Sequence, residues 1–273
     1  MSPLISVVSP SWNQGAYIAE CLSSCLVEEK GLVEHIIVDN CSDDETHQVI
    51  DGFPHVRAII EKDRGQSDAI NKGIKAARGA WILWLNVDDF MIPGAVKHLI
   101  ERIRIGIRED AVYGHMVLVD EHSERIRTVF QAWWRPWMIR FGVFATPSTG
   151  TLFRASILKE NLIGEDFHMI MDTEWSLRTM GKVKALRLRR EMVCFRLTED
   201  NKTAAHIKTG HLTPRHAKER KVLGAKYPSY GNYGETGRGR LFHFGVKLVR
   251  KCGRFLILTD KVISKVQHDI KNK

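Results

Sequence analysis

Apolar runs of strand length alternate with segments of helical periodicity over the first 105 residues, which restricts the folds available to the chain. The strand-like runs fall at residues 4–9, 35–39, 57–61 and 80–86, and the helical segments fall at residues 14–29, 43–52, 66–78 and 93–105. Strands that are joined by crossover helices pair in parallel. The sequence therefore predicts an α/β domain with a Rossmann-like, mostly parallel central sheet and flanking helices.

Carboxylates follow the most apolar of these strands. The run Trp-Ile-Leu-Trp-Leu at residues 81–85 leads directly to Asp88 and Asp89. Ligands of open α/β sheets bind outside the carboxyl ends of the strands, and hard oxygen ligands there suit Mg²⁺ or Mn²⁺ with phosphate oxygens completing the shell. A metal–diphosphate site is therefore expected. The alternative is a helix N-terminus, because Asp-Asp precedes Pro93 and an apolar helical pattern.

Five segments follow one another in the order of a known pattern. They are Ile-Ser-Val-Val-Ser-Pro-Ser-Trp-Asn (5–13), Ile-Ile-Val-Asp-Asn-Cys-Ser-Asp (36–43), the stretch 63–89 that begins Asp-Arg-Gly-Gln-Ser-Asp, Thr-Gly-Thr-Leu-Phe-Arg (149–154) and Met-Asp-Thr-Glu-Trp (171–175). With this ordered set, residues 3–203 resemble the family 2 glycosyltransferases of the GT-A fold. The resemblance implies transfer of a sugar, with inversion, from a nucleotide-sugar donor.

The resemblance also implies a set of donor-binding residues. It places nucleoside contacts after the first strand and at the end of the second, and a further part of the nucleotide pocket at the start of the third helix. The candidates are Pro10, Ser11, Asn13, Asp39, Arg64 and Asp68. Arg64 could bind phosphate through its forked guanidinium. The alternatives are that Asp39 only shapes a turn and that Ser67 or Asp68 only caps the helix.

Residues 86–88 occupy the place of the family's Asp-any-Asp motif, with Asn86 instead of the first aspartate. Asp88 is then the expected ligand of Mn²⁺ or Mg²⁺, Asn86 is expected to bind the donor, and Asp89 is expected to support the site from behind. The family often has a histidine where this chain has Thr198, so a metal contact from that segment is not expected. Lys202 could still face the diphosphate.

Asp172 matches the acidic residue that the family places beneath the acceptor, and we expect it to act as the general base. Glu174 is the alternative base, although it lies on a different side of a helix. Three tryptophans, Trp133, Trp134 and Trp137, could stack on an acceptor sugar or belong to the core.

The length of 273 residues and the 44% hydrophobic content suit one large core with an appended segment. We expect a GT-A domain at residues 1–205, with a nucleotide-sugar half at 1–110 and an acceptor half at 111–205, followed by a C-terminal helical extension at 206–273. Five cysteines without paired metal spacing indicate reduced thiols in the cytoplasm.

Residues 238–273 carry ten Lys or Arg against two Asp, which is +8 of the net charge of +9. Apolar residues recur there at helical spacing, so a basic amphipathic helix is expected. Such a helix can attach the chain to the anionic cytoplasmic face of a membrane. The alternative is a helix packed on the core with a solvated basic face. Nucleic-acid binding is not expected, because the aromatic residues lie on the apolar face.

Together these features predict a metal-dependent, inverting, hexosyltransferase-like enzyme. It would move a sugar from a nucleotide-diphosphate sugar to a saccharide or lipid-linked acceptor in cell-surface polysaccharide or glycan synthesis. The alternative is a non-catalytic nucleotide-sugar-binding scaffold subunit of a glycan-assembly complex, which the departures at Asn86 and Thr198 would favour.

Overall fold

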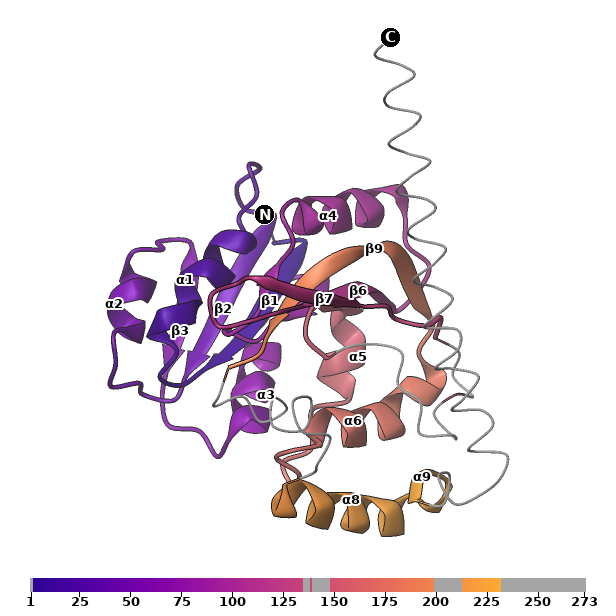
Figure 1. Ribbon diagram of the computed structural model, residues 1–273. Coiled ribbons are helices and arrows are strands. Elements are labelled where there is room, and N and C mark those ends of the chain that lie inside the picture. The colour runs from indigo at the N-terminus through magenta and orange to yellow at the C-terminus, as the bar shows by residue number, and fades with distance from the viewer. Residues whose placement is uncertain (1, 135–137, 139–147, 199–212, 232–273) are drawn as a thin grey trace.

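The computed structural model describes residues 2–134, 138, 148–198 and 213–231. Its first strands form a parallel block in the order β3-β2-β1-β4 (Figure 1). These strands are β1 (Ile5–Ser11), β2 (Val33–Asp39), β3 (Val56–Ile60) and β4 (Trp81–Trp84). The parallel sheet expected for the first half is therefore present, and the carboxyl ends of β1, β2 and β4 lie along one edge.

The second half extends the same sheet with mixed pairing, in the order β4-β8-β6-β9-β5 and with β7 against β6. The β6–β9 pair is parallel, whereas β4–β8, β6–β8, β6–β7 and β5–β9 are antiparallel. These strands are β5 (Phe90–Met91), β6 (Ala111–Val119), β7 (Arg125–Val129), β8 (Thr151–Arg154) and β9 (Ala185–Arg196). The sheet thus continues from the parallel block into the expected acceptor half.

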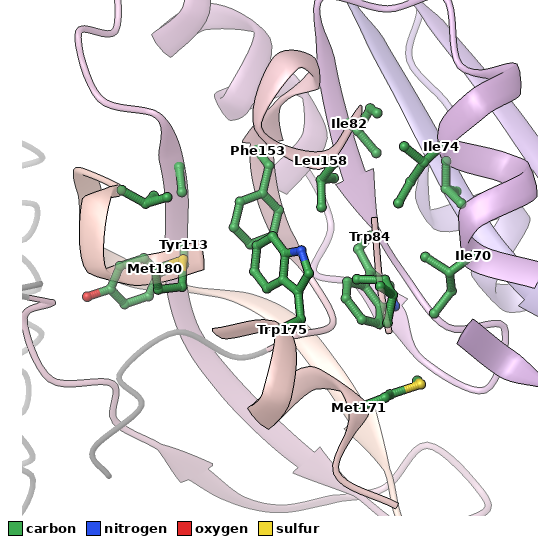
Figure 2. Packing of buried hydrophobic residues seen from close by; sticks show 14 of the residues in the cluster. Ile70, Ile74, Ile82, Trp84, Tyr113, Phe153, Leu158, Met171, Trp175 and Met180 are labelled. Atoms are coloured by element: carbon green, nitrogen blue, oxygen red, sulfur yellow. The ribbon is translucent and has the colours of Figure 1, made fainter. Parts of the chain in front are cut away.

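Helices cover both faces of the sheet, so β1 and β4 are buried along their whole length. One face packs against α1 (Gly15–Ser24) and α4 (Ala95–Ile105), and the other packs against α3 (Gln66–Ala76), α5 (Ala155–Glu160) and α6 (Met171–Thr179). On the second face the Trp175 ring of α6 meets the Phe153 ring of β8 edge-on at 5.2 Å (Figure 2). The helix that carries Asp172 is therefore anchored in the core.

Two helix limits differ from those expected by three residues or more. The first helix ends at Ser24 rather than near residue 29. The second, α2 (Thr46–Asp51), begins three residues later than expected, because the hydroxyl of Ser42 binds Asp39 and the chain between them forms a turn.

Beyond β9 the structure describes α8 (Pro214–Lys226) and α9 (Pro228–Gly231). Leu223 of α8 is completely buried in the cluster that contains Trp175, so α8 packs on the same side of the molecule as α6 (Figure 1). None of the described helices is long and apolar enough to cross a membrane. Residues 238–273, for which the sequence predicts membrane attachment, lie outside the described residues, as do Trp137 and Lys202.

Candidate active site

The end of β2 is organised around the buried carboxylate of Asp39. It accepts hydrogen bonds from the backbone N–H and the hydroxyl of Ser42, at 2.8 and 2.6 Å, and lies 2.8 Å from Nε2 of His47. Burial alone would raise the pKa of Asp39, but the hydrogen bonds from Ser42 and His47 hold the pKa below its ordinary value. Asp39 is therefore ionised at neutral pH and shapes the turn after β2, and its contact to the nucleoside stays a prediction.

The loop after β1 is tied to the loop after β2 through Asn13. Its Nδ2 donates to Asp43 at 2.7 Å and its Oδ1 accepts from the N–H of Asp43 at 3.0 Å. Asn13 itself has a positive φ of 51°, which asparagine tolerates better than most residues. Next to it, Trp12 exposes 61% of its surface. Pro10 and Ser11 are the last residues of β1, so all three predicted residues of this segment lie at the same edge as Asp39.

The start of α3 is held by Asp68, which accepts from the backbone N–H of Arg64 and from its guanidinium, both at 3.1 Å. Asp68 thus ties the residue before the helix to its first turn, and its contact to the donor stays a prediction. The Arg64 guanidinium also contacts Glu165 at 3.1 Å and remains largely exposed. Gly65 has a φ of +122° and its Cα faces the ring of His168, so a side chain there would be strained. The stretch 165–168 therefore lies over the start of α3.

Asn86 follows β4 and lies at the centre of a small polar network. Its Oδ1 accepts from the side-chain amide of Gln66 and from the indole N–H of Trp84, both at 3.2 Å. Its own amide donates to Asp89 at 3.3 Å. The amide of Asn86 is thus already oriented within the protein, so a contact to the donor stays a prediction.

Asp88 is partly exposed, whereas its neighbour Asp89 is buried. Burial and the adjacent charge of Asp88 raise the pKa of Asp89 well above its ordinary value. Asp89 accepts from the backbone N–H of Arg196 at 3.0 Å, which supports the loop from behind. Among the described residues there is no group of three or more His, Cys, Asp or Glu that could enclose a metal. A single accessible carboxylate suits a cation that takes its other ligands from a diphosphate and water, as Mg²⁺ does.

Asp172 lies in the first turn of α6 and is partly buried. Desolvation raises the pKa of its carboxyl above the ordinary value, although hydrogen bonds from Thr173 and Ser148 oppose this. Ser148 is followed by Thr149, which binds the Asn86 backbone N–H at 3.4 Å and also the Asp89 carboxylate. One short loop therefore contacts both the predicted base and the predicted metal loop, and brings them into one site.

Glu174, the alternative base, has a different environment from Asp172. It is 2% exposed and accepts from the hydroxyl of Tyr227 at 3.0 Å and from the ammonium of Lys226 at 3.1 Å. It also pairs with Arg178 at 3.4 Å. Burial would raise the pKa of Glu174, but these partners hold the pKa below its ordinary value. Glu174 therefore joins α6 to the end of α8.

Two buried charged residues that support the site were missed by the sequence analysis. Arg196 at the end of β9 donates to the backbone oxygen of Asp88 at 2.9 Å. Glu219 of α8 accepts from the backbone N–H groups of His168 and Met169, just before α6. The signal in the sequence was weak. For Arg196 it was a charged residue directly after the apolar run Val-Cys-Phe.

The tryptophan cluster divides in the structure. Trp134 is buried and donates its indole N–H to the oxygen of Val183 at 3.1 Å, as a core residue would. Trp133 is half-exposed and lies under the guanidinium of Arg187 at 4.1 Å.

Thr198, at the place of the family's histidine, is buried.

Proteins with related sequences match less than half of this chain. The succinoglycan biosynthesis protein ExoO of Rhizobium meliloti is 37% identical over 103 residues, which cover 37% of this chain and 30% of that protein. The chondroitin synthase of Escherichia coli is 32% identical over 115 residues, which cover 41% of this chain and 17% of the synthase. The chain thus spans less than a third of the length of either relative.

Solved structures share the fold over a longer stretch. The S. aureus TarS structure 1–349 in complex with UDP-GlcNAc superposes with a TM-score of 0.61 at 18% identity, over 81% of this chain and 65% of that one. The mannosyltransferase PcManGT of Pyrobaculum calidifontis, in complex with GDP-Man and Mn²⁺, superposes with a TM-score of 0.53 at 14% identity, over 94% and 84%. These likenesses confirm the predicted GT-A type of α/β fold.

The family model of glycosyl transferase family 2 matches residues 6–159, more than half of the chain. The segment 171–175, which carries Asp172, lies outside the matched residues. The match begins in β1, includes Asp39 at the end of β2 and the loops that carry Arg64 and Asp88, and ends in α5. This chain therefore belongs to glycosyl transferase family 2.

Proposed function

We propose that this protein transfers a sugar from a nucleoside diphosphate sugar to a saccharide or lipid-linked acceptor, in the synthesis of a polysaccharide or glycan. The single observation that supports this most is the loop 148–149, which contacts both Asp172 and the Asn86–Asp89 segment. The relatives named for succinoglycan biosynthesis and chondroitin synthesis support the polysaccharide class. The structural neighbours, bound to UDP-GlcNAc and to GDP-Man with Mn²⁺, support the donor class.

The nucleoside would bind at the ends of β1 and β2. Trp12 offers an exposed aromatic face there, and such a face can stack on a planar base. The polar groups of Ser11, Asn13 and Asp39 lie at the same edge and offer hydrogen bonds to the base and ribose. Arg64 and Asp68 would border the diphosphate side, where the exposed guanidinium of Arg64 would exchange its pairing with Glu165 for a phosphate.

Asp88 would hold Mn²⁺ or Mg²⁺ against the diphosphate. A bound divalent cation neutralises the charge that develops on the leaving diphosphate. The partly exposed Asp88 offers the carboxylate, while the buried Asp89 and the oriented amide of Asn86 keep the loop in place. The site thus needs few protein ligands, as is usual for Mg²⁺ beside phosphates.

Asp172 would accept the proton of the acceptor hydroxyl. As the acceptor oxygen bonds to the anomeric carbon, the bond from that carbon to the diphosphate oxygen breaks and the nucleoside diphosphate leaves with the electron pair. Attack from the face opposite the diphosphate inverts the anomeric configuration. The raised pKa of Asp172 makes its carboxylate a better proton acceptor than an exposed aspartate.

A thermal-shift panel of nucleotide sugars tests this proposal, because a ligand that binds only the folded state raises its melting temperature by mass action. We expect UDP-sugars or GDP-sugars to stabilise the protein more with Mn²⁺ than without it, and slow release of nucleoside diphosphate to accompany binding. Stabilisation without any release would favour the scaffold alternative. No stabilisation by any nucleotide sugar would contradict both functions.

A further inference from the structure

Arg196 is a buried arginine, and the proposed reaction does not require it to contact a substrate. Only 2% of its side chain is exposed, and it lies at the end of β9 opposite Val119 of β6. An arginine keeps its charge under all ordinary conditions, and a buried charge is costly unless it is paired and hydrogen-bonded. The partners of Arg196 therefore show what this charge is used for.

The guanidinium of Arg196 joins three separate segments. Its Nε donates to the backbone oxygen of Asp88 at 2.9 Å, and its Nη1 donates to the oxygen of Glu121 at 3.0 Å and to the hydroxyl of Ser123 at 2.9 Å. Its Nη2 pairs with the carboxylate of Glu20 on α1. The planar fork thus connects the loop after β4 to the β6–β7 turn and to α1.

The partners of Arg196 also bind one another. The hydroxyl of Ser123 donates to the Glu20 carboxylate at 2.7 Å, which closes a triangle of side chains. The aromatic rings of Tyr17 and Phe90 lie 4.8 and 5.3 Å from the guanidinium carbon. The guanidinium therefore has little freedom to move.

The main chain that leaves Asp88 is held at two points by the same residue. The carbonyl of Asp88 accepts from the Arg196 guanidinium, and the side chain of the next residue, Asp89, accepts from the Arg196 backbone N–H at 3.0 Å. The N–H of Asp89 also donates to the oxygen of Asn86 at 3.1 Å, which closes the turn. The peptide group between Asp88 and Asp89 is thus held through both its carbonyl and its N–H, which restricts the position from which the Asp88 carboxylate extends.

We propose that Arg196 is a positioning residue that sets the Asp88 loop for a metal-bound diphosphate, and that Glu20 and Ser123 hold Arg196 in place for this task. The inference rests on the proposed metal role of Asp88. Supporting groups of this kind typically change metal affinity or activity by about 10- to 100-fold when they are altered. A lysine would keep the charge but lacks the fork that reaches Asp88 and Glu20 together.

The test compares Arg196→Lys with Arg154→Lys. Arg154 also donates to backbone oxygens, those of Glu109 at 3.1 Å and Ile107 at 2.6 Å, and also lies over an aromatic ring, that of Trp81. It sits beside the first residue of β4, at the opposite end of that strand from Asp88. Both substitutions therefore remove hydrogen bonds to backbone oxygens and a contact to an aromatic ring, but only Arg196 is near the proposed site.

Binding of Mn²⁺ is followed by the EPR signal of the free ion, with saturating UDP or GDP present. Nucleotide binding without metal is measured separately. We expect Arg196→Lys to raise the Kd for Mn²⁺ on the order of tenfold, with metal-free nucleotide binding changed less than twofold. Arg154→Lys should leave both values unchanged. An unchanged Kd in Arg196→Lys, or an equal increase in Arg154→Lys, would overturn the inference.

Glu20→Ala provides a second variant in case Arg196→Lys does not fold, because Glu20 is 42% exposed on a helix that accepts alanine well. It should raise the Kd for Mn²⁺ several-fold, and an unchanged value would count against the inference. If the wild-type protein binds no Mn²⁺ with either nucleotide, the proposed function fails as well. Failure in the wild type is thus distinguished from failure confined to the variants.

Discussion

Asp172 and Glu174 lie two residues apart on α6, and the structure predicts opposite consequences for their amide variants. Glu174→Gln removes a buried negative charge that contacts Lys226, Tyr227 and Arg178. Hydrogen bonds to charged groups contribute roughly 1.5–3 kcal/mol each, but glutamine keeps one acceptor oxygen and the two cations are partly exposed. We therefore expect a loss of about 2 kcal/mol in the free energy of unfolding.

For a domain of this size, about 1 kcal/mol corresponds to a melting-temperature change of roughly 2–4 °C. Glu174→Gln should therefore lower the melting temperature by roughly 4–8 °C, with turnover per folded molecule little changed. Asp172→Asn should instead raise the melting temperature and lower the turnover. The pKa of Asp172 is raised in the folded state. At a pH above the pKa of the unfolded state, the ionised carboxylate therefore lowers the free energy of unfolding. A neutral amide removes this destabilisation. Its turnover should fall on the order of a hundredfold.

Melting temperature by circular dichroism and turnover by nucleoside diphosphate release measure the two properties on the same samples. Donor binding by calorimetry serves as the control, since neither substitution should change it more than slightly. The reasoning fails if Asp172→Asn melts as early as Glu174→Gln. It also fails if Glu174→Gln loses turnover a hundredfold while Asp172→Asn retains it, which would make Glu174 the base.

Four further predictions follow from the structure. The specificity constant kcat/KM should fall on acidification through a pKa above the ordinary aspartate value of about 3.9, because the pKa of the proposed base Asp172 is raised in the ligand-free protein, and a pH–rate profile measures this. Glu219→Gln should lower the melting temperature at neutral pH. The difference from the wild-type protein should shrink as pH falls through the lowered pKa of Glu219, because the carboxylate stabilises the fold only while it is ionised. Melting curves across pH measure this, and a constant difference would refute it. Trp12→Ala should weaken nucleotide binding up to about tenfold by calorimetry, and an unchanged Kd would exclude stacking. Removal of residues 238–273 should abolish salt-sensitive co-sedimentation with anionic vesicles; equal sedimentation of both proteins would contradict a membrane role for this segment.

Local patterns in the sequence were sufficient for the parallel half of the sheet. The apolar run at 81–85 predicted a buried strand, and the structure places Asp88 and Asp89 directly after β4. The order of β1, β2 and β4 then brings Ser11, Asp39 and Asn86 to one edge, as the crossover rule implies. The carboxyl ends of these strands could therefore be assigned without coordinates.

The supporting contacts could not be assigned in this way. Arg196 reaches Asp88 across more than one hundred residues, because β9 pairs antiparallel with β5, where Phe90 lies opposite Cys194. The same strand lies parallel to β6 with two shifts of register. Neither the register of such a pair nor its bulges follow from periodicity. Glu219 likewise meets the start of α6 only through the packing of α8. The sequence does not distinguish a buried charged residue at the end of a strand from a solvated one.

The central claim is that Asp88 holds a divalent cation against the diphosphate of a sugar nucleotide. Release of nucleoside diphosphate from UDP-GlcNAc and GDP-mannose by the wild-type protein and by Asp88→Ala, with Mn²⁺ and with chelator, tests it most directly. We expect release by the wild-type protein with Mn²⁺ for at least one donor, none in chelator, and none by Asp88→Ala, which should keep the wild-type melting temperature. Release at the wild-type rate by Asp88→Ala, or by the wild-type protein in chelator, would contradict the claim.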